Sequence, residues 1–361
     1  MAVKQKLSIV PSSTGIYIMK GPRERPIYVG KAKNLRARLR SYFQESSGLD
    51  TRKSVMMREI RDFSYIVTAN ELEALVLEAN FIKRFKPKYN IILRDDKNYP
   101  YLKLAVNEEW PRLEVVRRIA RDGSIHFGPY VPTGIMWETL AFVRHNFPIR
   151  TCRHKLDRPM RPCVQYQMGR CLAPCTGELS RDKYMEAVNE VKLFLQGQRK
   201  ELLENLHKRM ERLSDELKFE EAANIRDRLR VIEKAWGKQR VVAPELGDMD
   251  AIGLYREKQE AVVFILFIRN GMIIGQRDFF LKRLKDAGDD EVLRSFIEQF
   301  YSKEILPPLA IILPVQAELH TQRLWLSEKR GETVKLSIPK TEKEFNVLRM
   351  ASDNAAIAFR R

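Results

Sequence analysis

The sequence predicts an α+β chain of several domains, on three observations. Alternating apolar and polar residues between Gly15 and Gly30 predict two paired strands, and a basic helix follows them. A proline-free stretch from Ser180 to Arg230 carries apolar residues at helical spacing. From residue 247 on, three strand patterns precede alternating helices and strands. A chain of 361 residues is long enough for two or three domains.

The first predicted domain begins with two strands, GIYIMK at 15–20 and PIYVG at 26–30. Successive side chains of a strand point to opposite faces, so Tyr28 and Gly30 share one face of the second strand. If the two strands pair, Tyr17 of the first strand lies on that same face. The connection between them is rich in Gly, Pro and charge, which is typical of an exposed hairpin loop.

A basic helix is predicted to follow these strands. Apolar residues recur at every fourth position from Leu35 to Phe43, which indicates a helix with Asn34 as its N-cap. Arg38 and Tyr42 are also four residues apart, so their side chains share a face of this helix.

Glu78 belongs to a second predicted helix, in the sequence ELEALVLEANFIKRF. The apolar face of this helix consists of Leu72, Leu75, Ala79 and Ile82, and Glu78 lies beside that face rather than on the fully solvated side. We therefore expect a partly sheltered carboxylate at this position.

The stretch from Thr14 to Phe43 resembles the GIY-YIG nuclease module, with Tyr28-Val29-Gly30 standing for the second half of its signature. The resemblance implies hydrolysis of a phosphodiester bond, with Glu78 binding Mg²⁺ or Mn²⁺. It also implies that Arg38 neutralises phosphate oxygens and that Tyr17 is the general base, directly or through water. The other catalytic residues that the resemblance implies are Tyr28, Gly30, Lys31, Tyr42 and Asn90.

Each of these residues also has an ordinary explanation. Tyrosines in strands usually pack, an arginine-rich helix is usually a solvated face, and a single Glu on a helix is usually surface charge. Their joint occurrence in the expected order within residues 14–90 favours the nuclease interpretation.

The charge of the chain agrees with a polyanionic partner. The formal net charge is +18, and the basic excess is concentrated at the N-terminus. Residues 1–100 contain 20 basic and 10 acidic side chains, whereas residues 241–361 contain 18 of each. We therefore expect the predicted nuclease domain to face DNA.

The sequence carries no signal for a membrane. Its longest wholly apolar run, AVVFILFI at 261–268, is too short to span a bilayer. The chain does not open with a charged and then apolar leader, so we expect a cytoplasmic location.

Residues 96–150 are predicted to form a small β-rich bridging unit. The patterns YLKLAV and RLEVVRRI predict strands, Asp122-Gly123 predicts a turn, and a helix is expected near 135–146. Aromatic residues here could stack on nucleic-acid bases, but their spacing favours packing in the core. They are Tyr99, Tyr101, Phe127, Tyr130 and Trp137.

All four cysteines of the chain lie within the segment 151–180. They are Cys152, Cys163, Cys171 and Cys175. In a compartment that keeps thiols reduced, four clustered cysteines favour a metal site over disulfides. The irregular spacing and the Pro before the last Cys favour an iron–sulfur cluster, [4Fe–4S], with Zn²⁺ and free thiols as alternatives.

Residues 181–240 are predicted to form a helical hairpin. The string LKFEEAANIRD within it resembles the UVR motif, which implies docking on the repair helicase UvrB. An ordinary coiled-coil connector is the alternative. The residues that would contact the partner are Leu217, Phe219, Ala222, Ala223, Arg226 and Asp227.

Residues 247–361 are predicted to form an α/β domain with the element order of an RNase H-like fold. Asp250, Asp278 and Asp353 are candidate metal-binding acids, but nothing in their sequence setting distinguishes them from surface acids. We therefore expect this domain to be catalytically silent, a spacer or a docking surface.

The whole order of motifs, with the nuclease module over 1–95, resembles the UvrC family of bacterial nucleotide excision repair. The resemblance implies incision of damaged double-stranded DNA on the 3′ side of the lesion, in complex with UvrB. It also leads us to expect that the RNase H-like endonuclease and helix-hairpin-helix regions of the family are missing. The alternatives are a UvrB-docking module that does not cut productively and a stand-alone structure-specific nuclease.

Overall fold

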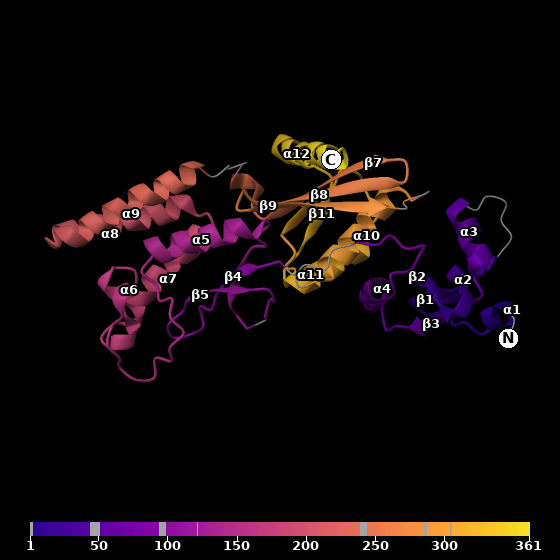
Figure 1. Ribbon diagram of the computed structural model, residues 1–361, viewed down its shortest axis with the longest axis horizontal. Coiled ribbons are helices and arrows are strands. Elements are labelled where there is room, and N and C mark those ends of the chain that lie inside the picture. The colour runs from indigo at the N-terminus through magenta and orange to yellow at the C-terminus, as the bar shows by residue number, and fades with distance from the viewer. Residues whose placement is uncertain are drawn as a thin grey trace. The chain divides into compact units, whose positions relative to one another are not determined.

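The structure, a computed structural model, describes residues 3–43, 51–93, 99–120, 122–238, 244–282, 284, 287–303 and 305–361. The chain divides into two compact units (Figure 1). The first contains Met1–Lys97, Asp250–Ile265 and Arg277–Arg361, and the second contains Asn98–Met249 and Leu266–Gln276. The domain boundaries predicted at residues 95, 96 and 240 lie outside the described residues. No helix within the described ranges is both long and apolar enough to cross a membrane.

The N-terminal part of the first unit is a three-stranded antiparallel sheet with helices. Its elements are α1 (Val3–Ser8), β1 (Gly15–Lys20), β2 (Pro26–Ala32), α2 (Leu35–Phe43), α3 (Thr51–Glu59), β3 (Asp62–Val67) and α4 (Glu71–Phe85). The strand order is β2-β1-β3. Tyr17 pairs with Gly30 and Met19 with Tyr28, so both tyrosines lie on one face of the sheet, as predicted. Asn34 caps α2, because its side-chain oxygen accepts the amide of Ala37 at 2.9 Å.

The two faces of this sheet are buried by different helices. Tyr17 shares a core with Leu35 and Leu39 of α2. On the opposite face, Val29 packs with Ile82 of α4. Residues of β2 can therefore contribute side chains to both α2 and α4, because neighbouring positions alternate between the faces.

The C-terminal part of the first unit contains most of a five-stranded sheet of order β11-β10-β7-β8-β9, since Met249 and Leu266–Gln276 are assigned to the second unit. Its elements are β7 (Met249–Glu257), β8 (Glu260–Arg269), β9 (Met272–Lys282), α10 (Asp289–Tyr301), β10 (Ala310–Ile312), α11 (His320–Arg330), β11 (Lys335–Ser337) and α12 (Glu342–Phe359). Three strands precede alternating helices and strands, which is the predicted order. Helices α10 and α11 pack against α4 of the N-terminal part.

The second unit begins with a small sheet of order β5-β4-β6 and a helix. Its elements are β4 (Tyr101–Leu104), β5 (Leu113–Val116), β6 (Ile125–Phe127) and α5 (Thr133–Asn146). Four of the five aromatic residues predicted for the core are at most 8% exposed. The prediction is wrong for Trp137, which is 55% exposed. Met136, Leu140 and Val143 form the buried stripe of α5, and Trp137 lies beside that stripe.

The predicted hairpin at 181–240 is three helices. They are α7 (Arg181–Leu195), α8 (Arg199–Asp215) and α9 (Phe219–Lys238). The prediction missed the break between α7 and α8, where Gly197 adopts φ of +65°. Glu190 of α7 is buried and accepts hydrogen bonds from Arg209 of α8 and Arg228 of α9, at 2.9 and 3.0 Å. This charged group ties α7 to the α8–α9 hairpin.

Candidate active site

A cluster of two buried tyrosines, Tyr17 and Tyr42, and the exposed Arg38 lies between β1 and α2. The hydroxyls of Tyr17 and Tyr42 are 3.0 Å apart, and the Arg38 Nε atom donates to the Tyr17 hydroxyl at 3.4 Å. Tyr28 completes a set of three rings with centroids 5.8 to 6.5 Å apart. Gly30 is required here, because a Cβ atom would lie 2.5 Å from the Tyr17 hydroxyl oxygen.

Burial controls the protonation of this cluster. It raises the pKa of Tyr17 well above the ordinary value; Tyr42 raises it further, and Arg38 lowers it. Burial likewise raises the pKa of Tyr28. Both phenols are therefore protonated at neutral pH in the described arrangement, and the nearby Arg38 guanidinium opposes this.

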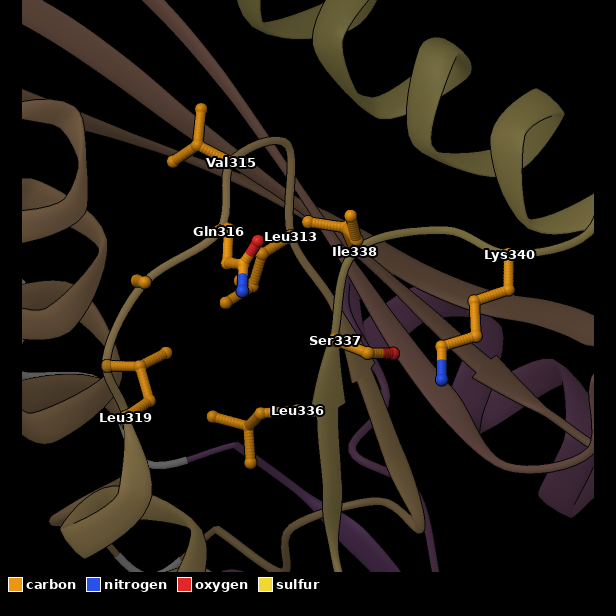
Figure 2. Close-up of a pocket in the computed structure, with 9 residues that line it drawn as sticks. Leu313, Val315, Gln316, Leu319, Leu336, Ser337, Ile338 and Lys340 are labelled. Carbon is orange, nitrogen blue, oxygen red and sulfur yellow. The ribbon is translucent and has the colours of Figure 1, made fainter.

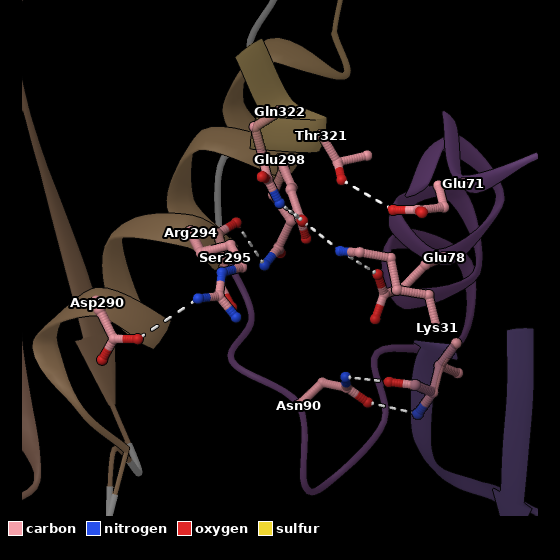
Figure 3. Close-up of polar contacts among 12 residues, drawn as sticks. Lys31, Glu71, Glu78, Asn90, Asp290, Arg294, Ser295, Glu298, Thr321 and Gln322 are labelled. Atoms are coloured by element: carbon pink, nitrogen blue, oxygen red, sulfur yellow. Dashed lines mark hydrogen bonds and ion pairs between the residues drawn. The ribbon is translucent and has the colours of Figure 1, made fainter. Parts of the chain in front are cut away.

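Lys31 and Glu78 form a second polar group, on the α4 side of the sheet. The Lys31 Nζ atom lies 3.0 Å from Glu78 Oε2 and 2.5 Å from Glu298 Oε1, so the lysine sits between two carboxylates (Figure 3). Glu78 is only 8% exposed. Burial raises the pKa of Glu78 to about 7; Lys31 lowers this pKa and Glu298 raises it.

The predicted catalytic side chains fall into two groups. Tyr17, Tyr28, Arg38 and Tyr42 contact one another, and Lys31 pairs with Glu78. Burial raises the pKa of Tyr28, and the charges of Tyr17, Tyr42 and Glu78 raise it further. The Asn90 side chain instead binds the backbone of Val29. Its Oδ1 atom accepts the Val29 N–H, and its Nδ2 atom donates to the Val29 carbonyl, both at 2.8 Å. This holds β2 in place between Tyr28 and Gly30.

The sequence gives no signal for a further set of contacts, which come from α10 and α11. Gln322 Nε2 donates to Glu298 Oε1 at 2.6 Å, and the Thr321 hydroxyl donates to Glu71 at 3.2 Å (Figure 3). Gln299 binds the backbone of the segment after Asn90. Its Nε2 atom donates to the Ile91 carbonyl and its Oε1 atom accepts the Leu93 N–H, both at 2.8 Å. Gln299 and Thr321 lie more than 200 positions from their partners in the N-terminal part, and they belong to no recognisable motif.

Glu78 has the chemistry of a ligand for a hard divalent cation. Mg²⁺ is commonly held by one or two carboxylates together with waters and substrate phosphates. No three His, Cys, Asp or Glu side chains of the described residues are placed to hold one metal ion together. A cation at Glu78 would therefore depend on this one carboxylate, water and the substrate.

The cysteine segment contains the short helix α6 (Val164–Gln167) and four thiols that influence one another. Burial raises the pKa of Cys171 to about 11, the Ala173 amide lowers it, and Cys152, Cys163 and Cys175 raise it further. As described above, no three of them are assembled as metal ligands.

The tip of the α8–α9 hairpin exposes apolar side chains. Leu217 is 74% exposed and Phe219 is 62% exposed. Ala222 is buried within the hairpin, and Ala223 is partly buried beside it. Arg226 and Asp227 form an ion pair with each other at 2.9 Å, and both side chains are exposed.

The acids of the C-terminal part do not converge. Asp250 is fully buried and accepts the Tyr301 hydroxyl at 2.5 Å, whereas Asp278 and Asp353 are exposed. A cavity of about 340 Å³ lies at the ends of β10 and β11, and Lys340 is the one charged residue among the described residues that line it (Figure 2). This cavity has no acid to bind a metal.

Four family models match the chain in sequence order. They are the UvrC-like GIY-YIG domain over residues 13–91, the UvrC/Cho excinuclease middle domain over 99–194, the UvrB/uvrC motif over 200–235 and the UvrC Ribonuclease H-like domain over 248–361. The last match corrects one prediction: an RNase H-like region of the family is present in this chain.

Full-length relatives align along the whole chain. UvrABC system protein C of Caldanaerobacter subterraneus subsp. tengcongensis is 40% identical over 100% of this chain and 59% of its own length. The protein of the same name from Symbiobacterium thermophilum is 42% identical over 98% of this chain and 57% of its own length. The chain therefore spans somewhat more than half the length of these relatives.

Solved structures match the N-terminal part. A magnesium-bound GIY-YIG N-terminal endonuclease domain of UvrC from Thermotoga maritima is 41% identical, covering 24% of this chain and 94% of that one, with a TM-score of 0.22. A point mutant of the same domain, bound to its catalytic divalent cation, is 39% identical, covering 25% and 96%, with a TM-score of 0.23.

The chain thus carries a GIY-YIG domain, a UVR motif and an RNase H-like domain on one polypeptide. The matched families and the relatives at about 40% identity are all UvrC proteins or domains found in UvrC proteins.

Proposed function

We propose that this chain is a divalent-metal-dependent DNA endonuclease of nucleotide excision repair, which incises the damaged strand 3′ to the lesion in complex with UvrB. Two observations carry the proposal: the cluster of Tyr17, Tyr42 and Arg38, and the Lys31–Glu78 ion pair of the neighbouring β2 and α4. These side chains from β1, β2, α2 and α4 pair with one another, and burying polar groups is costly unless they are paired.

Each side chain has a defined role in the proposed reaction. Arg38 and Lys31 bind the phosphate and neutralise its charge. Tyr17, hydrogen-bonded to Tyr42, takes the proton of the attacking water, directly or through a second water. A divalent cation, Mg²⁺ or Mn²⁺, held by Glu78 would supply Lewis-acid stabilisation of the developing charge.

The base role of Tyr17 requires a lower pKa than burial alone allows. Arg38 is the side chain that lowers this pKa, both by its charge and by its hydrogen bond. Arg38 thus has two functions in the proposal, since it binds the phosphate and favours the phenolate.

We further propose a [4Fe–4S] cluster, in preference to Zn²⁺, at the four cysteines. Four thiols within one segment can supply the four ligands of such a cluster, and the irregular spacing lacks paired zinc knuckles. The cluster would have a structural or redox-sensing role. Reconstitution with iron and sulfide should give visible absorbance that Cys171→Ala abolishes, whereas stoichiometric zinc in the purified protein would contradict the proposal.

The partner-binding proposal rests on the hairpin tip. Leu217 and Phe219 present exposed apolar surface that a matching helical motif of UvrB can cover. Burial of an aromatic anchor is expected to dominate the affinity, so Phe219→Ala should weaken UvrB binding more than Arg226→Ala.

Incision of a lesion-containing duplex tests the proposed activity. Each strand end is labelled in turn, and the chain is added with UvrA, UvrB, ATP and Mg²⁺. The proposal predicts one cut on the damaged strand, 3′ to the lesion, that requires UvrB. Binding to UvrB without any cut would leave only a docking module, and a cut without UvrB would indicate a stand-alone nuclease.

A further inference from the structure

A polar cavity beside α5, in the second unit, belongs to none of the sites described above. It has a volume of about 410 Å³, within the range of small-ligand sites. Its lining residues are Arg112, Leu113, Glu114, Val115, Trp137, Arg144, Thr151 and Arg153. Trp137 and Arg144 are seven residues apart on α5, so both project from the same side of the helix after two turns.

Trp137 is the exposed exception among the five aromatic residues predicted to pack in the core of the bridging unit. It is 55% exposed, whereas the other four predicted core aromatics are at most 8% exposed. Leaving a tryptophan face in water forgoes a large hydrophobic stabilisation. The face is therefore available to a ligand with a flat apolar surface.

Two guanidinium groups border this aromatic face. Arg144 and Arg153 are exposed, and neither forms an ion pair or hydrogen bond with any described residue. Arg112, by contrast, is paired with Glu114 and donates to the Cys152 carbonyl. The cavity thus offers two uncompensated positive charges to an anion.

We infer that this cavity binds an unpaired nucleotide of a DNA strand, with the base stacked on Trp137 and the flanking phosphates on Arg144 and Arg153. An aromatic face with cations beside it is the arrangement with which proteins hold single strands, and each stacked base contributes substantially to affinity. A base within an intact duplex has no free face to present. The inference rests on the proposed function in taking DNA as the substrate.

The position of the site connects it to the cysteine segment. Thr151 and Arg153 flank Cys152, whose carbonyl is held by Arg112 at 3.3 Å. The conformation of the chain at Cys152 therefore sets the place of the Arg153 guanidinium at the cavity.

Binding of a short fluorescein-labelled oligodeoxythymidylate to the full chain, followed by anisotropy in EDTA, tests the inference without cleavage. Trp137→Ala should weaken binding by about 5- to 100-fold. Arg144→Gln and Arg153→Gln should each lower the slope of log affinity against log salt by about 0.7. The matched control is Phe345→Ala with Arg349→Gln on α12, which removes an exposed aromatic side chain and one charge elsewhere.

Photo-crosslinking locates the contact directly. An oligonucleotide with 5-iodouracil at one position should crosslink to the peptide that contains Trp137, and duplex DNA or free deoxythymidine monophosphate should compete poorly. Unchanged affinity in Trp137→Ala, with crosslinks elsewhere, would overturn the inference, as would a preference for an acidic peptide over DNA. Glu78→Gln should bind like the wild type, so loss of incision and loss of this site are measured separately.

Discussion

The N-terminal and C-terminal parts of the first unit each bury a carboxylic acid, with different surroundings. Glu78 forms an ion pair with Lys31 at 3.0 Å, and Lys31 also pairs with Glu298 of α10. Asp250 is fully buried and engaged by the Tyr301 hydroxyl, while the other candidate acids of its domain are exposed. A buried acid alone therefore does not mark a candidate catalytic site; several polar groups must also meet at it.

Substitution of a buried tyrosine should give the largest difference in incision rate between the two domains. Tyr17→Phe keeps the ring but removes the proposed base, so incision should fall by about 10²- to 10⁴-fold. Tyr301→Phe, which removes an equally buried hydroxyl from the C-terminal part, should leave the rate per folded molecule unchanged. Single-turnover incision with UvrA and UvrB measures both, and equal losses would erase the distinction between the domains.

Arginine substitutions should also lower the incision rate in the N-terminal part but not in the C-terminal part, by a somewhat smaller factor than the tyrosine substitutions. Arg38→Lys retains the charge but loses the fork that reaches both the phosphate and the Tyr17 hydroxyl, so we expect a loss of about 10²- to 10³-fold. Arg256→Lys in β7 is the control, since Arg256 binds backbone carbonyls and Asp289. Full activity of Arg38→Lys would show that a point charge suffices.

Metal binding and stability should both depend on pH through the Glu78 carboxyl group. Its pKa is raised from the usual 4.5 to about 7, so metal binding should weaken about tenfold per pH unit below that value. The folded state then holds a proton that the unfolded state releases, so stability should fall as pH rises from about 4.5 to about 7. Glu78→Gln should remove this slope, and an unchanged slope in a urea titration series would refute the assignment.

The smallest effect is expected for stability in the C-terminal part. Asp250→Ala leaves the buried Tyr301 hydroxyl without this acceptor, which should cost about 1–3 kcal/mol. Asp250→Asn retains an acceptor oxygen and should cost less. Urea unfolding of the two variants checks the order, and a larger loss in Asp250→Asn would show that the negative charge itself is needed.

Local patterns predicted the elements of the site well, because strand alternation and helix periodicity depend on near neighbours. Tyr17 and Tyr28 share a face, and Asn34 caps its helix, as the sequence indicates. Contacts that depend on packing between distant elements were missed. Glu298 binds Lys31 from 267 positions away, and Trp137 is exposed only because the buried stripe of α5 passes beside it.

We propose that Glu78, and not Asp250, belongs to the cutting site. The most direct test compares single-turnover 3′ incision by the wild type, Glu78→Gln and Asp250→Asn, with UvrA, UvrB, ATP and Mg²⁺. We predict that Glu78→Gln loses at least about 100-fold in rate while still binding UvrB, and that Asp250→Asn cuts like the wild type. Incision that survives in Glu78→Gln but disappears in Asp250→Asn would contradict the account.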